Sequence, residues 1–97
     1  MGGEDARAMG TDDHRRAFTA FAAMLLADFD RYLDRAGAHP DLAADRVGYR
    51  QAAVWVTDEE FDAMAADMAA VLRQRMANVP GNGRRRRLVS TINVPAE

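Results

Sequence analysis

Apolar side chains recur every three or four residues along residues 12–36, which predicts a long helix. Thr11 is its expected N-cap, and Asp12 and Asp13 fall in the first turn, where the helix dipole favours acidic groups. Gly37 is expected just past the C-terminal end, because glycine readily adopts the conformation that terminates many helices. The apolar stripe of this helix consists of Phe18, Phe21, Leu25, Phe29 and Tyr32.

The middle of this first helix is apolar on nearly every side, from Ala17 to Ala27. A helix on the surface of a monomer normally keeps one polar face. The pattern therefore predicts that the helix is covered from two sides, with a second copy of the chain as the second cover. The alternative is an alanine-rich helix that reflects helix propensity alone. On the first interpretation, the apolar stripe is the dimer interface.

A second helix is predicted from Asp58 to about residue 77, and its start is the most strongly marked boundary in the chain. Thr57 and Glu60 have the spacing of a capping box, in which each side chain accepts the backbone N–H of the other residue. Val56 and Phe61 flank the box at the positions of a hydrophobic staple. The stripe expected to be buried consists of Phe61, Met64, Ala65, Met68, Leu72 and Met76.

Two further segments, residues 47–56 and 84–94, are rich in β-forming residues and predict strands. The order helix, strand, helix, strand predicts an α+β fold, a small α-β-α-β domain over residues 12–97. A strand–helix–strand unit normally crosses over right-handed and gives a parallel pair. Because two strands alone are marginally stable, we expect the sheet to extend across a homodimer.

The length of 97 residues allows one small domain, and 48% hydrophobic residues indicate a folded chain. Residues 1–11, with three glycines and no apolar period, are expected to be a flexible tail or the stub of an upstream region.

The absence of cysteine excludes disulfides and thiolate chemistry. The longest uncharged run has 11 residues, whereas a membrane span needs about 20. With no secretory pattern in view, we expect a cytoplasmic protein.

Charge is unevenly distributed around a net value of −2. Residues 1–67 carry 14 acids and 7 arginines, whereas residues 68–97 carry 6 arginines and 1 glutamate. Such asymmetry favours either a nucleic-acid contact or association between unlike surfaces. The arginine run could neutralise nucleic-acid backbone phosphates; a solvated turn that faces an acidic neighbour is the simpler interpretation, because no aromatic residues are interleaved. The arginine run consists of Arg84, Arg85, Arg86 and Arg87.

One set of apolar side chains with a few polar groups has the composition of a small-ligand pocket. Ordinary core packing, with the indole N–H bonded to the backbone, is the alternative. The predicted ligand-binding residues are Tyr49, Gln51, Trp55, Met64 and Met68.

The residue types that carry catalysis or bind metals are not grouped in this sequence. His14 and His39 are the only histidines and lie 25 residues apart, so no metal site is expected. There is no glycine-rich phosphate loop after a strand and no nucleophile elbow. We therefore predict neither a cofactor nor an enzyme.

A resemblance to a known family rests on three consecutive features: Val54-Trp55-Val56 before Thr57-Asp58-Glu59-Glu60, the amphipathic helix, and the segment from Gly83 to Pro95. Together they resemble the C-terminal half of the ArsR-like winged helix-turn-helix transcriptional regulators of actinobacteria. In those proteins, a DNA-binding winged helix is followed by a helix, a strand, a capped helix and a final strand that ends in proline. The resemblance covers residues 16–95.

The resemblance implies a dimerisation and effector-sensing domain of a bacterial transcriptional regulator, without catalytic residues. The winged helix has no counterpart in these 97 residues, so the sequence is expected to be either a fragment or a stand-alone copy of the regulatory half. DNA would be reached only through that missing head. The alternatives are an interaction module that pairs with a full-length regulator, and a weak nucleic-acid backbone binder that uses the arginine run.

Overall fold

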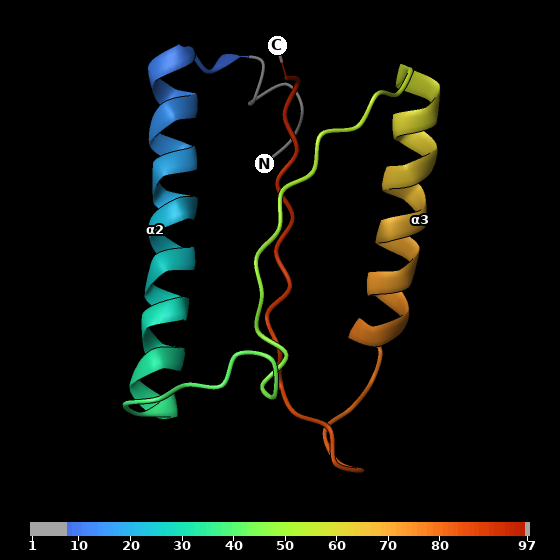
Figure 1. Cartoon of the computed structure of the whole chain (residues 1–97). Coiled ribbons are helices and arrows are strands. Elements are labelled where there is room, and N and C mark those ends of the chain that lie inside the picture. The colour runs from blue at the N-terminus through green and yellow to red at the C-terminus, as the bar shows by residue number, and fades with distance from the viewer. Residues whose placement is uncertain (1–7, 97) are drawn as a thin grey trace. The chain divides into compact units, whose positions relative to one another are not determined.

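The computed structural model describes residues 8–96 and divides the chain into two units, Met1–Tyr49 and Arg50–Glu97. Each unit contains one long helix, α2 (Thr11–Ala36) in the first and α3 (Asp58–Met76) in the second (Figure 1). Residues 1–7 of the predicted flexible tail lie outside the described residues. The single domain over residues 12–97 stays a prediction.

The N-cap of α2 lies one residue before the expected cap, Thr11. Gly10 is the N-cap, and its N–H donates to the Asp13 carboxylate at 3.1 Å. Thr11 is therefore the first helical residue, and the prediction that its side chain caps the helix is wrong: no side chain does so, because glycine offers none.

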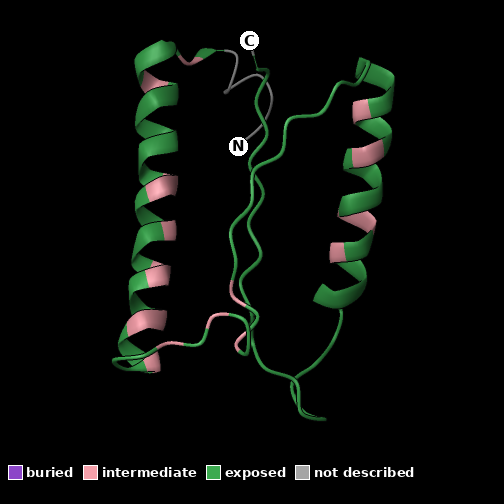
Figure 2. Cartoon of the chain, viewed as in Figure 1, coloured by how far each residue is buried: buried purple, intermediate pink, exposed green. Residues whose placement is uncertain are grey.

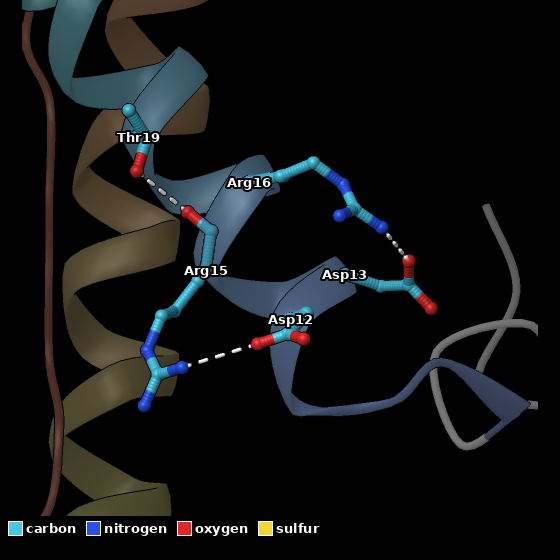
Figure 3. Close-up of polar contacts among 5 residues, drawn as sticks. All are labelled: Asp12, Asp13, Arg15, Arg16 and Thr19. Atoms are coloured by element: carbon cyan, nitrogen blue, oxygen red, sulfur yellow. Dashed lines mark hydrogen bonds and ion pairs between the residues drawn. The ribbon is translucent and has the colours of Figure 1, made fainter.

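Short-range polar contacts follow along the first turns of α2 (Figure 3). Arg15 pairs with Asp12 at 3.1 Å, and Arg16 pairs with Asp13. The Thr19 hydroxyl donates to the Arg15 carbonyl oxygen at 2.7 Å. Acids one turn before arginines on an exposed helix surface each contribute a few tenths of a kcal/mol, roughly 0.2–0.5. These contacts therefore support the helix locally and do not tie it to another element.

The C-terminal end of α2 lies where the sequence places it. Gly37 has φ 88° and ψ −163°, and its N–H donates to the Leu33 carbonyl oxygen at 3.2 Å. A single turn then follows, in which the Asp45 N–H donates to the Asp41 carbonyl oxygen at 3.1 Å and the Val47 N–H to the Leu42 carbonyl oxygen at 2.8 Å. The turn brings the chain back toward the helix it has left.

Helix α3 begins with the predicted capping box. The Thr57 hydroxyl accepts the Glu60 N–H at 3.1 Å, and the Glu60 carboxylate accepts the Thr57 N–H at 2.8 Å. Acidic residues fill the first turn, and Arg73 and Arg75 lie in the last turn, so both ends complement the helix dipole. The helix ends at Met76, one residue before the expected end.

The prediction of an α+β fold is wrong: the described residues form an all-α structure without strands. Residues 47–56 and 84–94 are drawn as plain traces in Figure 1, and the two-stranded sheet predicted from them is not formed. Among the described residues, no backbone hydrogen bond involves residues 48–56. Alternating apolar residues indicate which face of a segment is apolar. A strand forms only when the backbone of a neighbouring segment pairs with that segment.

No described residue is buried in either unit (Figure 2). The stripe predicted to be buried on α3 is at most half-buried, at Phe61, Met64 and Leu72. The described residues of neither unit therefore form a hydrophobic core, although nearly half of the sequence is hydrophobic.

Candidate functional site

The first candidate surface is the aromatic cluster of unit 1, which we define as Phe29, Tyr32 and Tyr49. The ring centroids of Phe29 and Tyr49 lie 6.3 Å apart at 81°, an edge-to-face arrangement. Those of Phe29 and Tyr32 lie 6.1 Å apart at 50°. Both distances fall in the range in which aromatic pairs attract each other beyond simple burial. The cluster therefore joins α2 to the segment that follows its turn.

A hydrogen bond also joins the turn before this segment to α2. The Tyr32 hydroxyl donates to the Asp45 carboxylate at 2.7 Å. This hydrogen bond, with a smaller contribution from desolvation and from the negative charges of Asp45 and Asp41, raises the pKa of Tyr32 above its usual 10.0. The bond thus favours the neutral phenol, which serves as a donor in this contact.

The predicted dimer interface forms a partly covered stripe on α2. Phe21, Leu25, Phe29 and Tyr32 are half-buried, whereas Phe18 is 51% exposed and has its ring 6.4 Å from that of Phe21. Apolar residues outside the stripe are also open to solvent, since Leu26 is 65% exposed. The helix thus presents apolar side chains both within the stripe and beside it.

The predicted ligand-binding residues are divided between the two units. Tyr49 belongs to unit 1, where it contacts Phe29, while the other four belong to unit 2. Trp55 is 100% exposed, so within its own unit it is neither a core anchor nor the wall of a pocket. Met68 alone of the five lines the groove described next. The small-ligand site stays a prediction.

The second candidate surface is an open apolar groove in unit 2, between the middle of α3 and the segment that follows the Pro80–Gly83 turn. Its exposed lining surface is apolar. Val71 and Val89 remain more than half exposed, so nothing within the unit fills the groove. The groove is lined by Asp67, Met68, Val71, Leu72, Val89 and Thr91.

The arginine run follows a tight turn at the end of α3. Gly81, Asn82 and Gly83 all have positive φ, and the Arg84 N–H donates to the Gly81 carbonyl oxygen at 3.0 Å. The Arg84 guanidinium donates to the Val79 carbonyl oxygen at 3.0 Å. All four arginines are exposed, and none is in a helix, so the run is a charged, extended surface.

Sequence reasoning missed Asp45 and the contact of Tyr49 with Phe29, and it missed Val71, Val89 and Thr91 as groove residues. The position of Gly37 did indicate where α2 ends. It does not specify which later residue meets the helix, because that depends on the turn geometry.

Within residues 8–96, no group of three or more histidine, aspartate or glutamate side chains is arranged to hold a metal ion. The same range contains no helix with the length and apolar character needed to cross a membrane. The described residues instead form contact surfaces. Unit 1 carries the apolar stripe and the aromatic cluster, and unit 2 carries the apolar groove and the arginine run.

Comparison with known proteins gives no relative: no protein-family model, no curated protein and no solved structure matches the chain.

Proposed function

We propose that this chain is a dimerisation module that pairs with a second copy of itself, and that it serves a cytoplasmic transcriptional regulator without catalytic activity of its own. The observation that carries the first part is the lack of any buried residue among residues 8–96. Hydrophobic burial is the main favourable term in folding. A chain whose large apolar side chains stay exposed needs a further surface to cover them.

The helix α2 supports this proposal most directly. Its stripe residues are at most half-buried, and Leu26 and Met24 are open beside them. Exposed apolar patches of this kind mark protein interaction sites. A second copy is the simplest cover, because most soluble oligomers are homo-oligomers with closed symmetry.

The oligomeric state tests the dimer. Sedimentation at micromolar concentration should give a mass near twice 10.7 kDa. Trp55 supplies an independent readout: its emission should shift to the red when dilution dissociates the dimer, if the partner covers it. A monomer at all concentrations would contradict the proposal.

The regulatory part of the proposal rests on the resemblance of residues 54–60 and 83–95 to ArsR-like winged-helix regulators. The capping box of that pattern is present, whereas the two strands that flank the helix in those proteins are not formed. The mechanism would be indirect: the dimer sets the spacing of two DNA-reading heads on adjacent half-sites. A small effector would act on this spacing only if it bound two arrangements with different affinity.

A mixing experiment tests the regulatory part. The chain is combined with a full-length winged-helix regulator of the resembled group that carries an affinity tag, and mixed dimers are sought by co-purification. Mixed dimers that release operator DNA would support a role in controlling such a regulator. Failure of any such regulator to pair, while the homodimer forms, would leave a self-association module without the regulatory role.

A second candidate function is backbone binding to nucleic acid, which the exposure of the arginine run favours. Affinity for generic duplex DNA should then fall steeply with salt, as clustered arginines release condensed counterions. Absence of binding at low salt would eliminate this function.

A further inference from the structure

We propose that the apolar groove of unit 2 is filled by the same groove region of a second copy in a two-fold, antiparallel arrangement, in which the acidic start of α3 in each copy faces the arginine run of the other. This inference rests on the proposed self-association. It adds a second contact surface to that of α2 and fixes its orientation.

The order of charges along unit 2 is the first step of the argument. Residues 58–67 contain five acids and no arginine, and residues 73–87 contain six arginines and no acid. Between them lie residues 68–72, which are all apolar. Unit 2 therefore has an acidic end, an apolar middle and a basic end along one direction.

The position of the groove is the second step. Met68, Val71 and Leu72, which line it, come from this apolar middle, and Val89 joins them from the later segment. Met68 is 46% exposed, so the groove is accessible to a partner. Apolar surface at the centre with charged residues around it is the usual anatomy of a protein interface.

Symmetry supplies the third step. In a two-fold interface, a residue that contacts a second residue across the axis is itself contacted by the equivalent of that second residue. With the axis at the groove, the antiparallel arrangement brings the acidic end of each copy to the basic end of the other. A parallel arrangement would place acid against acid and arginine against arginine, which is repulsive. The charge order thus selects a second copy as the occupant and selects its direction.

Charge reversal tests the pairing. The acid variant carries Glu59→Arg and Asp62→Arg, and it spares Glu60 because that side chain caps α3. The basic variant carries Arg85→Glu and Arg86→Glu, and it spares Arg84, which bonds to the Val79 carbonyl oxygen. Each variant alone should self-associate about tenfold or more weakly than the wild type at low ionic strength, which corresponds to about 1.4 kcal/mol.

Mixing the two variants provides the decisive measurement. In the antiparallel dimer, a mixed pair has opposite charges at both ends, so an equimolar mixture should recover wild-type association by sedimentation. A fold defect caused by the substitutions would not be rescued in this way. The matched control, Glu4→Arg with Asp5→Arg, changes the net charge by the same amount as the acid variant without altering a residue of α2 or of unit 2, and it should leave self-association unchanged.

Three results would overturn the inference while the proposed dimer survives. They are a dimer indifferent to both reversals, two weakened variants that fail to recover on mixing, and a basic variant that loses only binding to generic duplex DNA. A wild-type chain that is monomeric at all concentrations would instead remove the proposed function, and this inference with it.

Discussion

The two units of this chain differ in how their helices are fixed. Helix α2 has a glycine as its N-cap, which offers no capping side chain. Two residues after the helix nevertheless contact it, Asp45 through Tyr32 and Tyr49 through Phe29. Helix α3 starts with a complete capping box, yet Trp55 just before it is fully exposed, and the groove beside its middle stays open. The stronger local boundary therefore belongs to the unit whose groove stays open.

This difference shows that a well-capped helix end does not by itself give the helix a tertiary contact. A capping box satisfies backbone groups within four residues and needs nothing from elsewhere. Covering an apolar stripe needs a second surface, and unit 1 supplies only part of one from its own turn. Unit 2 leaves Val71 and Val89 of its groove more than half exposed.

The largest expected effect concerns the stripe of unit 1. Leu25→Asp should weaken self-association by about a hundredfold or more, because burying an uncompensated carboxylate at an interface costs several kcal/mol. Leu25→Met, which preserves volume and apolar character, should retain the dimer. Sedimentation of both variants provides the measurement. Unchanged association of Leu25→Asp would move the dimer interface from unit 1 to unit 2.

The next effect concerns the chain reversal that gives unit 1 its internal contacts. Gly37 has φ 88° and ψ −163°, a region that is essentially restricted to glycine. Gly37→Ala should therefore lower the free energy of unfolding by about 1–3 kcal/mol, measured by urea denaturation. Gly48→Ala is the matched control: its added Cβ meets no atom within 4 Å and its φ is not positive, so its effect should stay below about 1 kcal/mol. Equal effects of both substitutions would argue against strain at Gly37.

A smaller effect is expected at the cap of unit 2. Thr57→Ala removes the acceptor of the Glu60 N–H and should lower stability by about 1 kcal/mol. Thr57→Ser keeps a hydroxyl at the same place and should remain close to wild type. Thermal unfolding followed by circular dichroism at 222 nm compares the two. A Thr57→Ala variant that melts with the wild type would mean that the cap adds nothing to the stability of the unit.

The smallest effect concerns the hydrogen bond that closes unit 1. The Asp45 carboxylate accepts from Tyr32 and raises the pKa of its phenol, so Asp45→Asn should lower that pKa toward 10.0. Because the folded-state pKa is the higher one, the contact stabilises unit 1 below about pH 10, and this contribution declines as the pH rises through the folded-state value. An NMR titration with 13C-labelled tyrosine reports the change.

Asp41→Asn serves as the comparison for this titration. Asp41 acts on Tyr32 through charge alone and is the weakest of the four causes, so its removal should lower the pKa less than Asp45→Asn does. An equal decrease of the Tyr32 pKa in both variants would mean that nearby negative charge, rather than the hydrogen bond, raises this pKa.

The sequence predicts most accurately where the interaction is confined to a few neighbouring residues. The glycine at the end of α2 and the start of α3 with its capping box follow from patterns that span a single turn, whereas the predicted start of α2 is misplaced by one residue. The strands at residues 47–56 and 84–94 do not, because β-forming residues reveal a preference and not a pairing partner. The groove and the Tyr49 contact depend on where the chain returns, which no local pattern encodes.

The unpaired backbone of residues 48–56 has a consequence for how the chain can be observed in solution. Amide protons without an acceptor in the protein exchange with solvent at nearly the rate of an unstructured peptide. Deuterium should therefore enter this segment within the earliest labelling times, well before the middle of α3. Any partner that covers Trp55 and its neighbours would slow the uptake, so these amides record the binding of that partner without a dye or affinity tag on either molecule.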